Sequence, residues 1–291
     1  MQINWEKWVG GGGDQKWMPL RQAVHTVLLA IANCESLKSH MMLKGGILMA
    51  LCYDSTRYTR DIDLSQTSKY QTGDESKLLE ELQAAIQDSV QELSYGLDCK
   101  VQSSQLKPPS EKNPTFPVLE VKIGYAYNDD KKNHPRLVAG TCTNVLEIDF
   151  SFNEKTKSAE EFEIAEGQSL LRYSLLDLVA EKFRALLQQE MRKRYRGQDL
   201  YDLLYLIRRV PNQLQSLKPE ILDALLVSAQ SKELMLTVSS MGEGEIRAMT
   251  QHDYDLLQDT VAAGSLEKFD IAYEEVRRFY TSLPWPNVAK T

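Results

Sequence analysis

The sequence lacks the paired cysteine spacing that builds structural metal sites and redox motifs. Its four cysteines, Cys34, Cys52, Cys99 and Cys142, lie far apart and include no CxxC pair, which excludes a four-cysteine zinc site. The four histidines are equally scattered and predict no histidine metal centre. We therefore expect reduced, mostly buried thiols in a protein of the cytoplasm.

Long apolar runs and an excess of positive charge are missing as well. No stretch of about 18 apolar residues is present, so no membrane span is expected. The first residues, 1–7, contain no apolar run of the kind that a secretory signal requires. The net charge of -7 excludes a strongly basic nucleic-acid coat, although it leaves room for a local basic patch.

The length and patterning predict an α/β (α+β) protein with two parts. The 291 residues, 42% of them hydrophobic, are enough for a substantial core in one large or two modest domains. Residues 1–16 contain the glycine run 10–13 and predict a flexible arm. Residues 17–168 mix helical and strand patterns, whereas 169–291 are almost entirely helical. We expect a mixed sheet with helices, followed by a helical C-terminal domain.

The periodicity of apolar residues places the elements. Alternating or short apolar segments predict strands at 41–43, 61–65, 99–103, 118–127, 145–152 and 161–164. Helical spacing predicts helices from about residue 19 and at 47–53, 74–93, 174–189, 197–209, 219–231, 252–263 and 266–283. Asp74 is a candidate cap for the helix that it begins.

Two aspartates, Asp61 and Asp63, stand at i and i+2 of one predicted strand. This spacing puts both carboxylates on one face, roughly 6–7 Å apart, where they suit a divalent cation such as Mg²⁺ or Mn²⁺. Alternatively, the pair forms only the solvent face of an edge strand. Aspartate is unfavourable in strands, so a pair of them favours a functional role.

A glycine pair upstream favours phosphate binding. Gly45 and Gly46 follow the first predicted strand and precede a short apolar helix. Glycine lets the backbone approach a phosphate closely, and the helix that follows directs free N–H groups at the anion. Lys44, Arg57 and Arg60 add positive charge around the same triphosphate.

A third carboxylate is expected from the strand at 145–152. It offers Glu147 and Asp149 on one face, and Asp149 is the better candidate because it lies nearer the strand's carboxyl end, where α/β sheets usually place their sites. We predict that Asp149 binds the metal with Asp61 and Asp63 or accepts a proton.

The segment 182–196 carries six basic side chains and one acid. Such a patch suits a triphosphate or an RNA backbone, and Tyr195 and Tyr201 offer faces for stacking an unpaired base. The alternative is a solvated helix end, where cations are also favoured.

Lys182 and two later aspartates form a second candidate group. Lys182 emerges from a mainly apolar helical stripe, so it either extends to the surface or meets an anion, and we favour the anion. Asp199 and Asp202 stand at i and i+3 of the next helix, where one of them is able to cap the helix or pair with Arg196. For Asp202, a purely structural role at the helix dipole is an equal alternative.

Taken together, these motifs resemble the AbiEii/AbiGii toxin family of nucleotidyltransferases. The match consists of Lys44-Gly45-Gly46, Ser55-x-Arg57 and Arg60-Asp61-Ile62-Asp63-Leu64, then Glu181-Lys182 with Ala185-Leu186, and finally Arg196-Gly197-Gln198-Asp199 with Asp202-Leu203. It covers about residues 40–210. The chain departs from the family pattern at Ile47, where relatives usually have threonine, and at Gln198, where lysine is common.

The resemblance implies a polymerase-β-type fold and the toxin half of a bacterial toxin–antitoxin or abortive-infection system. It implies transfer of a nucleotide from an NTP, with a tRNA 3′ end as the favoured acceptor and a cognate antitoxin as partner. It assigns Lys44, Gly45, Gly46, Ser55, Arg57 and Lys182 to nucleotide phosphates, Asp61 and Asp63 to metal, and an assisting role to Asp199. A protein hydroxyl, a small molecule such as an aminoglycoside, or a non-catalytic nucleotide-binding module are the alternatives.

Overall fold

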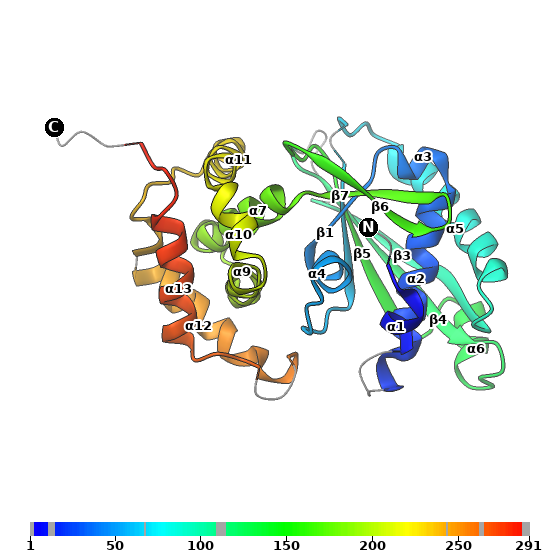
Figure 1. The fold of residues 1–291 in the computed structure, drawn as a ribbon. Coiled ribbons are helices and arrows are strands. Elements are labelled where there is room, and N and C mark those ends of the chain that lie inside the picture. Colours follow the sequence, from blue (N-terminus) through cyan, green and yellow to red (C-terminus); the bar gives the residue numbers. More distant parts are fainter. Residues whose placement is uncertain are drawn as a thin grey trace. The chain divides into compact units, whose positions relative to one another are not determined.

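The computed structural model describes residues 3–10, 15–66, 68–108, 115–242, 244–261 and 265–286. The chain forms two compact units (Figure 1). The sheet unit comprises residues 1–52, 59–154 and 159–172, and the helical unit comprises residues 53–58, 155–158 and 173–291. The main division therefore falls at 172/173 rather than at 168/169, and two short segments from the front half belong to the helical unit.

The sheet unit is built on one mixed sheet with the strand order β3-β4-β5-β2-β1-β7-β6. Its central strand β2 runs parallel to β5 and antiparallel to β1. The strands are β1 (Met42–Lys44), β2 (Asp61–Ser65), β3 (Leu97–Lys107), β4 (Val118–Tyr127), β5 (Val145–Ser151), β6 (Ala159–Ala165) and β7 (Gln168–Tyr173). The predicted fold class, a mixed sheet followed by a helical part, is confirmed.

Helices pack against the sheet and bury its apolar side chains. The side chains of α2 are buried along almost the whole helix, and α2 packs on α5 and on several strands, with α2 and α5 side by side in Figure 1. Together with Ile62 and Leu64, both 0% exposed, they form the core. The helices are α1 (Trp5–Gly10), α2 (Met18–Asn33), α3 (Glu35–Lys38), α4 (Gly45–Tyr53), α5 (Asp74–Glu92) and α6 (Asn133–Val138), with the short turn η1 (Gln15–Trp17).

The N-terminal segment differs from the loose arm that was predicted for 1–16. Trp5 in α1 stacks on His25 of α2 with ring centroids 3.9 Å apart, and its Nε1 donates to the Ile164 carbonyl. These contacts fix a helix too short to show a periodic pattern. Residues 11–13 of the glycine run and residue 14 lie outside the described residues.

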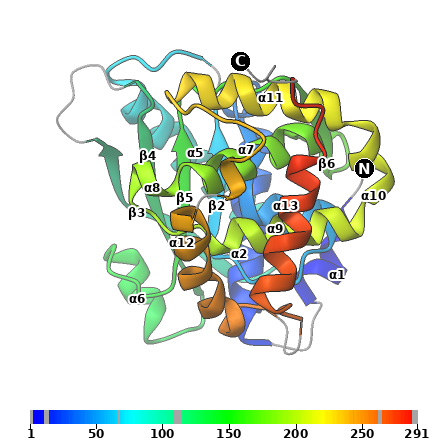
Figure 2. The same cartoon turned by 90° about the vertical axis from the view of Figure 1, so that its left-hand side faces the viewer.

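The helical unit is a group of amphipathic helices around α7 and α9, which Figure 2 shows with α11 and α13. Phe183 of α7 contacts Phe279 and Tyr280 of α13 in its core. The helices are α7 (Leu175–Leu187), α8 (Gln189–Arg192), α9 (Gly197–Arg209), α10 (Pro211–Ser216), α11 (Lys218–Ser231), α12 (Gly244–Tyr254) and α13 (Phe269–Thr281), with the turns η2 (Ser240–Gly242) and η3 (Asp255–Asp259). No described helix has the length and apolar character that crossing a membrane demands.

Three local predictions are corrected. The helix predicted at 252–263 begins instead at Gly244 and ends at Tyr254, because its buried stripe of Ile246, Thr250 and Tyr254 is narrow and includes a polar residue. Helix α6 and strand β7 were not predicted, since both are short and polar in sequence. Asp74 is the first residue of α5 rather than its cap, and its carboxylate accepts from the Gln71 N–H instead.

The segment 53–58 connects two elements of the sheet unit but is held by the helical unit. The Tyr205 hydroxyl of α9 lies 2.8 Å from the Tyr53 carbonyl and 2.9 Å from that of Asp54. The Tyr58 N–H donates to the Thr260 carbonyl. Each helical-unit contact therefore fixes part of a loop that carries two predicted site residues, Ser55 and Arg57.

Candidate active site

A row of charged side chains crosses the centre of the sheet. In the strand register, Asp63 on β2 stands between Lys44 on β1 and Asp149 on β5. Asp61 is one step along β2 and opposes Glu147. The burial of β2 alternates, with both aspartates less buried than the intervening apolar residues, which confirms that Asp61 and Asp63 share one face.

Gly45 lies directly against the carboxylate of Asp63. Its φ is +68°, and a Cβ placed on it would meet Asp63 Oδ2 at 1.9 Å. Only glycine fits this position, because it tolerates both the left-handed backbone and the close approach. Gly45 also begins α4, so the free N–H groups at the start of this helix lie beside Asp63. We call Asp61, Asp63 and Asp149 the acidic row.

The environment of Asp149 is crowded with negative charge. Burial raises the pKa of its carboxyl, and the charges of Glu120 and Asp61 raise it further, while Lys44 opposes them. Glu120 on β4 stands opposite Asp149 in the register. The sequence did not reveal Glu120 as part of this row, because the pairing of β4 with β5 depends on the fold.

The donor chemistry of this row fits a hard divalent cation. Asp61, Asp63 and Asp149 offer carboxylate oxygens, the ligands that Mg²⁺ prefers, and the negative charges of Glu120 and Asp61 add to burial in raising the pKa of Asp149. Within the described residues, however, no three acidic, histidine or cysteine side chains already converge on a common point. The fit therefore rests on donor type and strand register.

Ser55 and Arg57 have different surroundings in the loop 53–58. The Ser55 hydroxyl is buried and makes no hydrogen bond within the described part of the chain, so it keeps a donor that a ligand would satisfy. Arg57 instead donates from Nε and Nη2 to the two carboxylate oxygens of Asp202, each at 3.0 Å. This bidentate geometry is the strongest form of such a pair.

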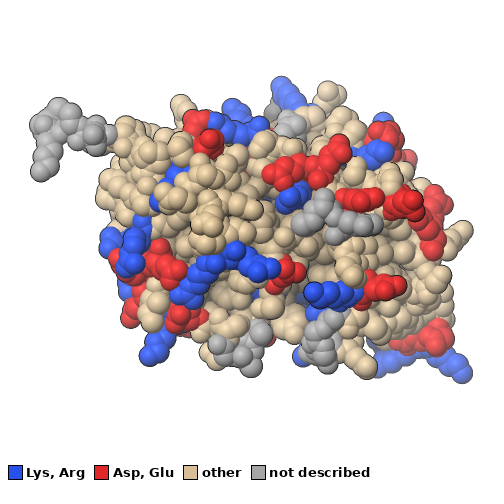
Figure 3. Space-filling view, viewed as in Figure 1, with Lys and Arg blue, Asp and Glu red and all other residues tan. Residues whose placement is uncertain are grey.

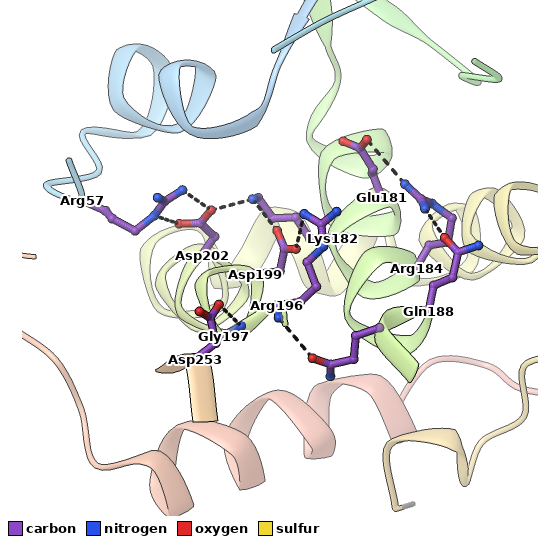
Figure 4. A network of polar contacts seen from close by, with 11 residues as sticks. Arg57, Glu181, Lys182, Arg184, Gln188, Arg196, Gly197, Asp199, Asp202 and Asp253 are labelled. Carbon is purple, nitrogen blue, oxygen red and sulfur yellow. Dashed lines mark hydrogen bonds and ion pairs between the residues drawn. The ribbon is translucent and has the colours of Figure 1, made fainter. Parts of the chain in front are cut away.

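Asp202 is the centre of a buried ionic network in the helical unit. Figure 4 shows it between Arg57 and Lys182, whose Nζ lies 2.6 Å from Asp202 Oδ2 and 3.3 Å from Asp199 Oδ1. Asp202 is 0% exposed and Lys182 is 5% exposed. Arg196 pairs with Asp199 at 3.7 Å, which is one of the alternatives that the sequence left open. These five residues form the Arg57–Lys182 cluster.

The cluster keeps its charges at neutral pH. Burial alone would raise the pKa of Asp202, yet Arg57 and Lys182 lower it to about 2. Burial would likewise lower the pKa of Lys182, but the charges of Asp202 and Asp199 raise it above its ordinary value. The cluster therefore holds three cations and two carboxylates in contact within the helical unit.

The predicted residues thus fall into two groups. The sheet unit brings together Lys44, Gly45, Gly46, Asp61, Asp63 and Asp149, and the helical unit brings together Ser55, Arg57, Lys182 and Asp199. Asp202 belongs to the second group, because it pairs with Arg57 and Lys182. From the sequence, a purely structural role at the helix dipole was an equal alternative for this residue. Tyr201 does not offer the stacking face that was predicted, because it is only 5% exposed.

The mixed sheet followed by a helical part is a fold found in nucleotidyltransferases. A protein from Helicobacter pylori, JHP933, matches over 92% of this chain and 91% of its own at 12% identity, with a TM-score of 0.52. A candidate nucleotidyltransferase from H. pylori matches over 92% and 94% at 13% identity, also with a TM-score of 0.52. These likenesses concern the fold.

The chain belongs to the AbiEii family, the nucleotidyl transferase toxins of type IV toxin–antitoxin systems, whose family model matches residues 27–275. The resemblance drawn from the sequence motifs is therefore confirmed. A third structure, the nucleotidyltransferase toxin MenT4 from Mycobacterium tuberculosis, matches over 96% of this chain and 97% of its own at 12% identity, with a TM-score of 0.46. The curated proteins contain no match to this sequence.

Proposed function

We propose that this protein transfers a nucleotide from an NTP to the 3′ end of an RNA, most simply a tRNA, in a reaction that depends on Mg²⁺ or Mn²⁺. The observation that carries the proposal is the charged row of Asp61, Asp63 and Asp149, with Gly45 fitted against Asp63. Carboxylates on neighbouring strands repel one another, and a divalent cation bound between them would relieve that repulsion. Bound metal would neutralise phosphate charge and hold the NTP.

The chemical step joins the RNA to the nucleotide and releases pyrophosphate. The acceptor hydroxyl oxygen forms a bond to the α-phosphorus, and the bond between that phosphorus and the α,β-bridging oxygen breaks. The hydroxyl proton passes to Asp149, whose raised pKa brings its basicity closer to the working pH. Asp61 and Asp63 are the residues that would hold the cation.

Each unit offers its own candidates for phosphate binding in this proposal. In the helical unit these are Lys182 and Arg57, which Asp202 fixes in position, and the buried hydroxyl of Ser55, which has a donor to spare. In the sheet unit they are Lys44 and Gly46 at the start of α4, whose N–H groups favour anions.

The partners follow from the same proposal and from the family. Membership in a type IV toxin–antitoxin family implies an antitoxin partner. An NTP and a tRNA are molecules of the cytoplasm, where we place the reaction. Activity on a protein hydroxyl or a small molecule would share the acidic row, and the acceptor assay below separates these outcomes.

A transfer assay tests the proposal. The protein is incubated with total tRNA and each α-labelled NTP in turn, with Mg²⁺ or with EDTA, and label in RNA and released pyrophosphate are both measured. An Asp61→Asn/Asp63→Asn variant is compared with Asp88→Asn/Asp129→Asn, which removes the same charge from exposed positions of the sheet unit.

The expected result is labelled tRNA with Mg²⁺ only, lost in the first variant and kept in the second. Label on protein would redirect the acceptor while keeping the chemistry. Absence of both label and pyrophosphate with every NTP would refute the proposal.

A further inference from the structure

Three adjacent cations stand on the surface where α8 ends. Arg192, Lys193 and Arg194 are all exposed, and in the described part of the chain none of them forms an ion pair. Elsewhere in the helical unit, several arginines contact acids. Arg208 contacts Glu275, and Arg247 contacts Asp270. Figure 3 likewise shows acidic and basic side chains interspersed over the face in view.

An exposed aromatic stack adjoins these cations. Tyr195 is 49% exposed and stacks on His252, itself exposed, with ring centroids 4.4 Å apart and planes inclined by 19°. An exposed tyrosine that is already held flat by one neighbour presents its other face without losing further rotamer freedom. A large exposed ring in this position has no role in the core.

The segment 192–196 that carries these side chains is held in place by one buried side chain. Gln189, 1% exposed, donates to the Ile246 carbonyl and the Thr250 hydroxyl of α12 and accepts from the Arg196 N–H. It also accepts from the Arg194 N–H through its backbone carbonyl. The cations and the aromatic stack therefore form one preorganised surface, which we call the 192–195 platform.

We infer that the 192–195 platform binds a single-stranded segment of the RNA acceptor, with one base stacked on Tyr195 and phosphates held by Arg192, Lys193 and Arg194. This inference rests on the proposed function for the identity of the acceptor. Cations that lack acidic partners attract a phosphate backbone, and an aromatic face binds any unpaired base.

The test measures RNA affinity by fluorescence anisotropy, in the inactive Asp61→Asn/Asp63→Asn background so that no product forms. The probes are total tRNA, a short single-stranded RNA and an RNA duplex of the same length. Tyr195→Ala is expected to weaken single-strand binding about 5-fold to 100-fold, with a much smaller effect on the duplex. Tyr195→Phe keeps the ring and is expected to bind normally.

A charge variant supplies the second measurement. Arg192→Gln/Lys193→Gln/Arg194→Gln is expected to weaken both probes and to lower the slope of affinity against salt by about 2 for the single strand. The matched control, Lys131→Gln/Lys132→Gln/Arg136→Gln, removes the same charge from exposed positions in the sheet unit and is expected to bind like the parent. Thermal unfolding checks that every variant is folded.

Either of two results would overturn the inference. One is single-strand affinity that Tyr195→Ala leaves unchanged. The other is unchanged RNA affinity in the triple variant together with lost binding of the antitoxin, which would assign the platform to the protein partner. The proposed function fails separately, if the unmodified protein transfers no nucleotide while Tyr195→Ala still weakens RNA binding.

Discussion

The Asp63 carboxylate lies so close to Gly45 that a Cβ added to this glycine would be 1.9 Å from Asp63 Oδ2. We predict that Gly45→Ala displaces this carboxylate and lowers transfer about 100-fold or more, as small misplacements of reacting groups do. Its positive φ adds a backbone cost of about 1–2 kcal/mol.

Gly96→Ala separates the two effects. Gly96 has a φ of +64°, but nothing lies within 4 Å of an added Cβ. It is expected to show a similar loss of stability in urea unfolding with transfer close to that of the parent. Full activity in Gly45→Ala would show that Asp63 does not need its present position.

Asp149→Asn is predicted to stabilise the protein while inactivating it. Burial, Glu120 and Asp61 raise the pKa of Asp149 above its ordinary value of 3.8. The folded state therefore binds this proton more tightly, and stability falls as pH rises from about 4 through the folded pKa. In EDTA at pH 7, the variant is expected to melt at a higher temperature than the parent, with the difference disappearing near pH 3.

The same substitution removes the proposed proton acceptor, so transfer is expected to fall by about 100-fold or more. Asp129→Asn, at an exposed site, serves as the control for both measurements. A variant that melts below the parent at pH 7 would contradict the electrostatic argument.

Asp202→Asn is predicted to cost about 3–5 kcal/mol of unfolding free energy, because it leaves the charges of Lys182 and Arg57 in a buried site without their main partner. Asp270→Asn breaks an exposed pair and is expected to change stability by less than about 0.5 kcal/mol. Urea unfolding at pH 7 measures both variants. A cost for Asp202→Asn as small as that of the control would rule out a structural role for the cluster.

Acid unfolding gives an independent view of the same pair. The pKa of Asp202 is lowered to about 2 from 3.8, so its stabilisation is complete above about pH 4 and is lost as pH falls toward 2. The parent is expected to lose stability across this window, and Asp202→Asn to show a flatter profile there.

The lowered pKa of His25 predicts a separate loss of stability at milder pH. Burial lowers its pKa from 6.5 to about 4, so protonation favours the unfolded chain as pH falls from 6.5 to 4, by an amount on the order of 2 kcal/mol. Urea unfolding at pH 7 and pH 4 measures the change. His25→Phe is expected to reduce it, whereas His252→Phe at an exposed position should leave it intact. An unchanged pH dependence in His25→Phe would place the titration elsewhere.

The parts of the fold that follow from the sequence are those set by local pattern. Strand β2 was predicted with its final bounds, because Ile62 and Leu64 alternate with Asp61 and Asp63. The common face of Asp61 and Asp63 was predicted for the same reason, since period-two spacing alone decides which side chains of one strand share a face. The glycine requirement at Gly45 followed from the motif, although its contact with Asp63 did not.

Interactions between distant residues could not be read from the sequence. Arg57 was predicted to meet phosphate, and its pairing with Asp202 depends on residues 145 positions apart. The burial of Tyr201 depends on how α9 is packed, which a tyrosine early in an amphipathic helix does not reveal. The helix of residues 5–10 was missed because contacts with His25 and Ile164, rather than its own pattern, hold it.

The loop 53–58 has a consequence for synthesis on the ribosome. Its partners in α9, Asp202 and Tyr205, are translated about 150 residues later, and chains fold from the N-terminus at about 5–20 residues per second. For roughly 7–30 s at that rate, the nascent chain holds a completed acidic strand but no Arg57–Asp202 pair. The buried ionic cluster of the helical unit therefore forms only once the last third of the chain has been made.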